Sequence, residues 1–237
     1  MANAKGNIQE YIAAKTREII RGRLASDKIR GFIKDNTRKV ETMFTYYNCA
    51  MMEVETKFKV LNEELTLSHA HTPIETIKTR LKSMDSLMEK VDRYGIPLSV
   101  ESIMENINDI AGIRIICSFK DDIYSLVDSF LSQDDVTLVE KKDYIANPKE
   151  NGYRSLHLIV SVPIFLEKQK RDMKVEVQFR TIAMDFWASL EHKIKYKKDL
   201  PESINEKLVS ELAMCAEISA DLDEKMQDIR RQLTEAS

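Results

Sequence analysis

The chain has 237 residues, of which 43% are hydrophobic and 32% charged, with a formal net charge of -3. This length supports a sizeable core, and only 6 Gly and 5 Pro argue against disorder or a loop-rich all-β fold. The mildly acidic balance gives no general electrostatic reason to bind RNA or an anionic membrane, so neither partner is predicted. A membrane span and a signal-peptide core are both missing from the pattern, which favours a cytoplasmic protein.

The three cysteines, Cys49, Cys117 and Cys215, are odd in number and far apart, in apolar surroundings. We therefore expect reduced cysteines in the core, not a disulfide framework or a metal site.

Two long apolar seams predict helices over about 22–67 and 201–234, the second with Pro201 in its first turn. The seams could pack on the central domain or join subunits, and their length favours a subunit contact. The first seam repeats at steps of four and three, and so does the second: Val40, Phe44, Tyr47, Met51, Val54, Phe58, Leu61 and Leu65, then Ile204, Leu208, Leu212, Cys215, Ile218, Leu222, Met226, Ile229 and Leu233.

The middle of the chain has a mixed α/β pattern, which predicts one mixed sheet flanked by helices. This divides the chain into a helical region 1–72, a central domain 73–200 and an amphipathic helix 201–237. Strands are expected at 74–80, 110–119, 136–145, 153–162 and 173–180, and helices at 83–94, 122–131 and 181–197.

Strand alternation separates apolar from polar side chains in two of these strands. Glu176 and Gln178 fall on the polar face of 173–180, and Tyr153, Ser155 and His157 on that of 153–162. One such face is ordinarily solvated. Two adjacent polar faces, one with an aromatic and one with a carboxylate, favour a cleft.

The helix at 83–94 carries a basic stripe. Its members recur at i, i+4, i+8 and i+11: Lys82, Ser86, Lys90 and Arg93. Arg80 would join them if it ends the preceding strand. Because Asp85 and Glu89 interrupt the charge, a solvated basic face is an equal alternative.

The strand at 110–119 places Arg114 among isoleucines, two residues after Gly112 and five after Asp109. A buried arginine needs an anion, which could be Asp109 or a ligand phosphate. Asp109 and Arg114 have opposite strand parity unless Gly112 marks a bulge. Asp109 facing Glu176 would instead make a two-carboxylate Mg²⁺ site completed by phosphate oxygens and water.

Three segments, NDIAGIRIIC, KDYIANPKENGYRSLH and VEVQFRTIAMDFWASLEHKIKYK, resemble the synthetase domain of RelA/SpoT-type alarmone enzymes. The small single-domain alarmone synthetases are the more similar members, and the resemblance covers about 73–200. It implies a nucleotidyltransferase-like α+β fold, a homotetramer, and transfer of the β,γ-diphosphate of ATP to the ribose 3′-OH of GDP or GTP.

The resemblance also implies roles for individual residues. Asp109 and Glu176 would hold Mg²⁺, with Glu176 as general base, and Tyr153 would stack on guanine. Cations would line the ATP phosphates, and further polar groups would surround the guanosine nucleotide: Arg80, Lys82, Ser86, Lys90, Arg93 and Arg114 for ATP, then Lys142, Lys149, His157 and Gln178 for GDP or GTP. Lys142 stands where the family often has arginine, so it keeps the charge and loses the bidentate fork.

Two other functions remain open on the sequence. A nucleotidyltransferase of similar fold would release pyrophosphate instead of AMP. A catalytically silent nucleotide-binding regulator should have lost its metal carboxylates, yet Asp109 and Glu176 are both present.

Overall fold

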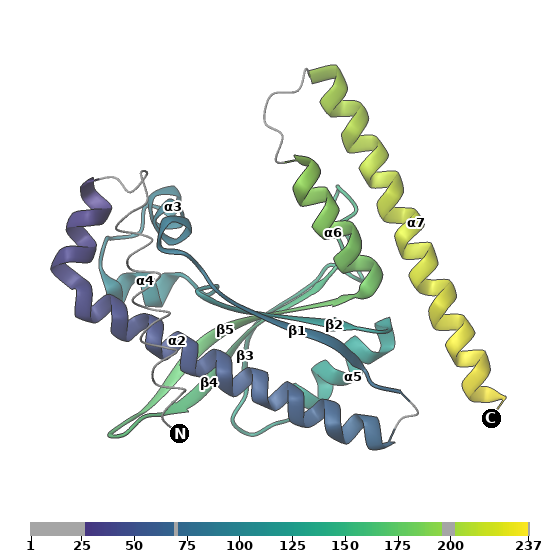
Figure 1. Cartoon of the computed structure of the whole chain (residues 1–237), viewed down its shortest axis with the longest axis horizontal. Helices are drawn as coiled ribbons and strands as arrows, with labels where there is room; N and C mark the ends of the chain where they lie inside the picture. Colours follow the sequence, from purple (N-terminus) through teal and green to yellow (C-terminus); the bar gives the residue numbers. More distant parts are fainter. Residues whose placement is uncertain (1–26, 69–70, 196–201, 237) are drawn as a thin grey trace. The chain divides into compact units, whose positions relative to one another are not determined.

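The computed structural model describes residues 27–68, 71–195 and 202–236 (Figure 1). Its centre is a five-stranded sheet in the order β1-β2-β5-β4-β3, with helices around it. The predicted α+β fold is therefore confirmed. The strands are β1 (Ile74–Leu81), β2 (Ala111–Cys117), β3 (Thr137–Asp143), β4 (Leu156–Phe165) and β5 (Lys170–Thr181). The helices are α2 (Asp27–Ser68), α3 (Met84–Tyr94), α4 (Val100–Asn106), α5 (Lys120–Leu131), α6 (Ile182–Lys195) and α7 (Glu202–Glu235).

The chain forms two compact units, and each is described by itself. Of the described residues, the first contains 27–54, 79–112 and 161–176, and so holds α3, α4 and the first part of α2. The second contains 55–68, 71–78, 113–160, 177–195 and 202–236, and so holds α5, α6 and α7. Four of the strands contribute residues to both units.

Local signals in the sequence explain where α3 begins and ends. The Ser83 side chain accepts a hydrogen bond from the backbone N–H of Ser86, which caps the first turn. Gly95 then ends the helix with a φ of 62°, a left-handed conformation that glycine adopts without a steric penalty. Met84, Leu87, Met88 and Val91 are buried, as the predicted apolar face requires.

The two long helices differ in what they bury. The seam of α2 lies in the core of this single chain, where Tyr47, Val54 and Phe58 are at most 1% exposed. Helix α7 instead buries a small and polar face, which contains Ala216, Asp223 and Gln227. The apolar seam of α7 lies largely in solvent, with exposed fractions of 49–65%: Ile218, Leu222, Met226, Ile229 and Leu233. Packing on the chain itself therefore accounts for the first seam and not for the second.

Several predicted boundaries need correction. Strand β4 begins at Leu156, so Tyr153 lies in the preceding loop, and Ser155 is fully buried, not on a polar face. Helix α4 was not predicted, because its seven residues are too few to establish a helical period. Cys117 is buried as expected, but Cys215 is exposed on α7.

Some expectations fall outside the described residues. These are the start of the first helix at 22–26, the signal-peptide argument on 1–11, the end of the predicted helix at 196–197, and Pro201. Among the helices that the structure describes, none combines the length and apolar character needed to cross a bilayer.

Candidate active site

In the first unit, two lysines converge on one carboxylate. Lys82 and Lys90 each donate a hydrogen bond to Oδ2 of Asp109, at 2.7 Å in both cases. A backbone bond of 2.8 Å from Lys82 N–H to the carbonyl of Ile110 brings the end of β1 beside Asp109. All three charged side chains are only about one-fifth exposed. The basic stripe is therefore a paired cluster at this point, not a solvated face.

The two lysines keep Asp109 ionised. Burial disfavours the charged form of the carboxyl, but hydrogen bonds from Lys82 and Lys90 outweigh this cost and hold the pKa of Asp109 below its usual value. Asp109 precedes β2 and is not part of it, so strand parity does not apply and no bulge is required. Its observed partners are lysines, and the proposed pairing with Arg114 is not the one that forms.

Glu176 lies close to the start of β2. A Cβ atom placed on Gly112 would stand 4.0 Å from Oε2 of Glu176 and 3.7 Å from the backbone oxygen of Arg80. The side chain of Glu176 is half-buried, and the alternation along β5 is as predicted, with Val175 and Val177 fully buried on either side. The carboxylate of Glu176 therefore lies within ordinary van der Waals reach of β2 at Gly112, three residues after Asp109 in the sequence.

The chemistry of these groups fits a magnesium ion. Oδ1 of Asp109 is buried and accepts no hydrogen bond within the part of the chain that the structure describes. A buried carboxylate oxygen with no donor is a suitable ligand for a hard cation. The same residues contain no group of three or more His, Cys, Asp or Glu side chains arranged to hold a metal. Oxygen atoms from a nucleotide or water would therefore have to complete the coordination of Asp109 and Glu176.

The other predicted ATP ligands in this unit are less constrained. Arg80 and Arg93 are exposed, and the Arg93 guanidinium lies 5.0 Å from the centre of the Tyr94 ring. Ser86 is half-buried and accepts a hydrogen bond from the hydroxyl of Ser83 at 3.0 Å. Exposed arginines at this position can reach a ligand without first breaking an ion pair in the core.

In the second unit, an aromatic and cationic cluster surrounds Tyr153. The Tyr153 hydroxyl lies 3.0 Å from Nε2 of His157, and the ammonium of Lys149 lies 4.9 Å from the centre of the Tyr153 ring. Tyr144 approaches both rings edge-on, at centroid distances of 6.1 Å to Tyr153 and 5.5 Å to His157. Three residues assigned from the sequence to the guanosine nucleotide, Lys149, Tyr153 and His157, are thus brought together.

A tight turn fixes the position of Tyr153. Gly152, at a φ of 82°, donates its N–H to the carbonyl of Lys149, and Asn151 accepts the N–H of Tyr153. A Cβ atom at Gly152 would come within 2.4 Å of Cβ of Ala216 on α7. The turn therefore needs glycine for both its backbone conformation and its contact with the helix.

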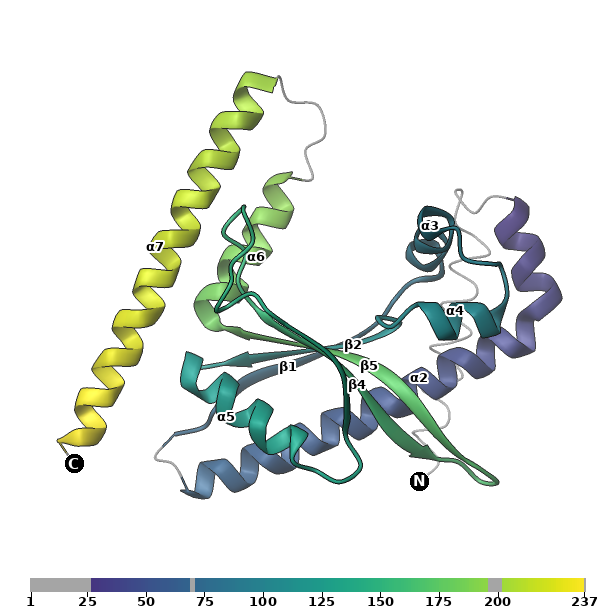
Figure 2. The same cartoon turned by 180° about the vertical axis from the view of Figure 1, so that it is seen from behind.

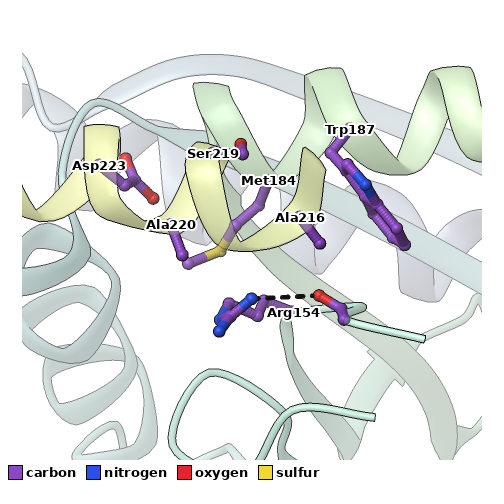
Figure 3. Close-up of a pocket in the computed structure, with 8 residues that line it drawn as sticks. Arg154, Met184, Trp187, Ala216, Ser219, Ala220 and Asp223 are labelled. Atoms are coloured by element: carbon purple, nitrogen blue, oxygen red, sulfur yellow. Dashed lines mark hydrogen bonds between the residues drawn. The ribbon is translucent and has the colours of Figure 1, made fainter. Parts of the chain in front are cut away.

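Figure 3 shows where this turn meets the helices. Arg154 donates a hydrogen bond to the carbonyl of Gly152, while Met184 and Trp187 of α6 face Ala216 of α7. The space between them measures only about 10 Å³, enough for no more than a water molecule. Tyr153 packs against Trp187, Ala188 and Ala216, so contacts with α6 and α7 hold the Tyr153 ring in place. The space between these helices is too small to be a ligand cavity.

A half-buried carboxylate, Asp185, organises the cations around Tyr153. Arg180 donates to Oδ1 of Asp185 at 2.9 Å and to the Tyr153 hydroxyl at 2.9 Å. Lys78 and Arg114 also reach Asp185, at 3.1 and 3.4 Å. Burial disfavours the charged form of Asp185, but hydrogen bonds from Lys78 and Arg180 outweigh it and hold the pKa of Asp185 below its usual value.

Arg114 differs from the sequence-based expectation. Its side chain is 35% exposed, and its anion is Asp185. Alternation explains this, because Ile113 and Ile115 point into the core while Arg114 points away from it.

The remaining predicted guanosine ligands lie on strands of the same unit. Lys142 is exposed on β3 and pairs with Glu140 at 2.8 Å, while Gln178 is half-buried on β5. The structure joins neither of them to Tyr153 by a described contact, so their roles stay predictions.

Sequence reasoning overlooked two residues of this cluster, Asp185 and the buried Arg180, which is 5% exposed. Strand alternation places Arg180 on the same face as Glu176 and Gln178, which predicts a polar, accessible position. The overlooked signal was the spacing: Arg180 and Asp185 stand five residues apart across a strand-to-helix junction that contains no other acidic side chain.

Comparison with known proteins identifies the family of this chain. A sequence-family model, described as a region found in RelA / SpoT proteins, matches residues 79–200 of this chain. The GTP pyrophosphokinase YwaC of Bacillus subtilis is 47% identical over 187 residues, which cover 79% of this chain and 88% of that protein. The crystal structure of small alarmone synthetase 2 from the same organism superposes with a TM-score of 0.70 at 46% identity, covering 79% of this chain and 96% of the other.

A second solved structure, small alarmone synthetase 1 of Bacillus subtilis bound to its product pppGpp, gives a TM-score of 0.74 at 36% identity. It covers 83% of this chain and 99% of the other. The chain therefore belongs to the RelA/SpoT family, and the resemblance to small alarmone synthetases seen in its motifs is confirmed.

Proposed function

We propose that the protein is a GTP pyrophosphokinase, which transfers the β,γ-diphosphate of ATP to the ribose 3′-OH of GDP or GTP. The products are AMP and a (p)ppGpp-type alarmone. The observation that carries this proposal is the ionised Asp109 held by Lys82 and Lys90, with the Glu176 carboxylate beside Gly112, in a chain of the RelA/SpoT family. Carboxylates and cations in one cluster suit a reaction that depends mainly on positioning and charge neutralisation.

On the donor side, the cations are proposed to hold the triphosphate of ATP. Lys82 and Lys90 now share one carboxylate, so each ammonium retains donors that can turn toward phosphate oxygens. The hydroxyl of Ser86 and three arginines would complete the set: Arg80, Arg93 and Arg114. Arginine suits this task because its planar fork binds two phosphate oxygens at once.

Asp109 and Glu176 would hold Mg²⁺, which when bound supplies positive charge to the phosphates and eases ionisation of the acceptor hydroxyl. Glu176 is proposed to take the proton of the ribose 3′-OH as general base, and the resulting oxyanion attacks the β-phosphorus of ATP with AMP as leaving group. A half-buried carboxylate is suited to this role because it is shielded from water while remaining reachable by a ligand.

On the acceptor side, the Tyr153 ring is proposed to stack on guanine, with His157, Lys149, Lys142 and Gln178 contacting the rest of the nucleotide. The hydroxyl of Tyr153 is fixed by Arg180 and His157, so little side-chain entropy remains to be lost on binding. Stacking of a base on such a ring contributes about 1–3 kcal/mol.

A homotetramer is part of the same proposal. Helix α7 buries a small and polar face and exposes the apolar stripe of Ile218, Leu222, Met226, Ile229 and Leu233. A helix that turns its apolar side to solvent is normally covered in an assembly. The helical region 1–72 and the helix 201–237 would thus flank a synthetase domain at 73–200, and a cytoplasmic location would give it access to ATP and GTP.

The substitution Glu176→Gln tests the chemistry. It removes the base and one metal ligand but keeps the shape, so synthesis should fall by at least about 100-fold while binding of GDP persists. The matched control is Glu167→Gln, at an exposed glutamate between β4 and β5, which should synthesise normally. A fully active Glu176→Gln variant would remove Glu176 from the mechanism.

A further inference from the structure

Apart from the Asp109 cluster, the first unit contains a cationic depression formed by residues that have no role in the proposed reaction. It measures about 370 Å³ and lies between α2 and α4, which run beside each other in both views (Figures 1 and 2). The lining comes from these helices and from β5: Arg38, Lys39, Thr42, Met43, Tyr46, Val100, Glu101, Met104 and Arg171. Sites for small organic ligands begin at roughly this size.

Apolar side chains line part of the depression. Met43 and Val100 are 1% and 5% exposed, and Met104 is half-buried. Tyr46 adds a ring whose hydroxyl accepts a hydrogen bond from Gln169 at 3.1 Å, which fixes its orientation. These groups offer apolar contact to a planar body.

The charged groups of the depression are strongly biased toward cations. Arg38, Lys39 and Arg171 oppose a single carboxylate, Glu101, which pairs with Lys39 at 2.9 Å. Within residues 27–68, 71–195 and 202–236, no carboxylate lies within ion-pair distance of Arg38 or Arg171. The Arg171 guanidinium instead lies 5.2 Å from the centre of the Tyr46 ring. The depression therefore carries an excess of two positive charges in a chain whose net charge is negative.

We propose that this depression is a binding site for a small organic phosphate with a planar body, separate from the Asp109 cluster. The planar body would contact Tyr46 and the methionines, and the phosphate would lie between Arg38 and Arg171. Two arginines that face an anion provide several donors in fixed geometry, which favours a phosphate ester over a carboxylate of single charge. The proposal does not depend on the pyrophosphokinase activity.

Binding of 1-naphthyl phosphate to the full-length protein, followed by its fluorescence, tests the site. Saturable binding is expected, weaker by about tenfold in Arg38→Ala and in Arg171→Ala, since each substitution removes a charge-assisted hydrogen bond. The matched control is Lys34→Ala, an exposed cation one turn earlier on α2, which should bind as the unchanged protein does. Glu101→Gln should bind the probe about twofold or more tightly, because it removes the one negative charge.

Each other outcome would overturn the proposal. If Lys34→Ala weakens binding as much as Arg38→Ala, the attraction is diffuse and no site exists. If Lys90→Ala abolishes binding and Arg171→Ala does not, the probe occupies the Asp109 cluster. Equal affinity for inorganic phosphate would show that the apolar surface contributes nothing, and much tighter binding of a short oligonucleotide would assign the surface to nucleic acid. Circular dichroism of every variant confirms that the fold is retained.

Discussion

Replacing Asp185 by asparagine should affect both stability and the binding of the guanosine substrate. The Asp185 carboxylate accepts from Arg180 at 2.9 Å, with side chains that are 13% and 7% exposed. Arg180 in turn holds the Tyr153 hydroxyl. The substitution keeps the shape of the side chain and one acceptor oxygen but removes the negative charge opposite a buried guanidinium.

The magnitude follows from the exposure of each partner. Breaking a buried ion pair costs about 3–5 kcal/mol, because the remaining charge is left without compensation. The asparagine oxygen can still accept one bond from Arg180, which returns about 1 kcal/mol. Lys78 is 55% exposed, so the loss of its pairing adds between zero and about 1 kcal/mol. The free energy of unfolding should therefore fall by about 2–5 kcal/mol.

Urea denaturation of Asp185→Asn beside the exposed control Asp134→Asn measures this difference, and steady-state kinetics measures the KM for GDP. We expect the KM of the Asp185 variant to rise several-fold, because Tyr153 loses a fixed partner, while the control remains unchanged. A loss of stability below about 1 kcal/mol together with an unaltered KM would refute the account of Asp185 as the group that orders this cluster.

Three further substitutions test other parts of the second unit. Tyr153→Ala should raise the KM for GDP by roughly tenfold or more through lost stacking, with the KM for ATP as internal control; an unchanged KM for GDP would remove Tyr153 as platform. Gly152→Ala should destabilise the protein by at least about 1–3 kcal/mol in thermal unfolding, because its Cβ meets Ala216 at 2.4 Å, and a neutral result would contradict that packing. Burial raises the pKa of Asp223 despite a hydrogen bond from Thr181, so ionisation of this carboxyl opposes folding, and the stability that the protonated form provides is lost as pH rises through the folded pKa. In urea denaturation across pH, Asp223→Asn should lessen this loss of stability at higher pH. An unchanged pH dependence of stability would contradict this role of Asp223.

The sequence predicted most of the fold because its elements have strong local signals. Ser83 and Gly95 mark the two ends of α3, and alternation along β5 separates Val175 and Val177 from Glu176. Helix α4 escaped prediction since it is too short to show a period. The sequence led to the same expectation of a subunit contact for both long seams, yet the α2 seam packs within the chain. Apolar periodicity indicates which face seeks a partner but not whether that partner is in the same chain.

For the site, residue types were easier to predict than pairings. Asp109 and Arg114 are five residues apart, and a mutual ion pair was a reasonable expectation. The structure instead pairs Asp109 with Lys82 and Lys90, and Arg114 with Asp185, 71 residues away. Contacts at such separations depend on tertiary packing, which local sequence patterns do not encode.

The most direct test of the proposed activity is chromatographic. Incubated with Mg²⁺, ATP and either GDP or GTP, the protein should release AMP in step with a guanosine nucleotide that carries two additional phosphates. Release of pyrophosphate without AMP would show nucleotidyl transfer instead. No turnover of nucleotides that demonstrably bind would contradict the assignment of a pyrophosphokinase and favour a silent regulator.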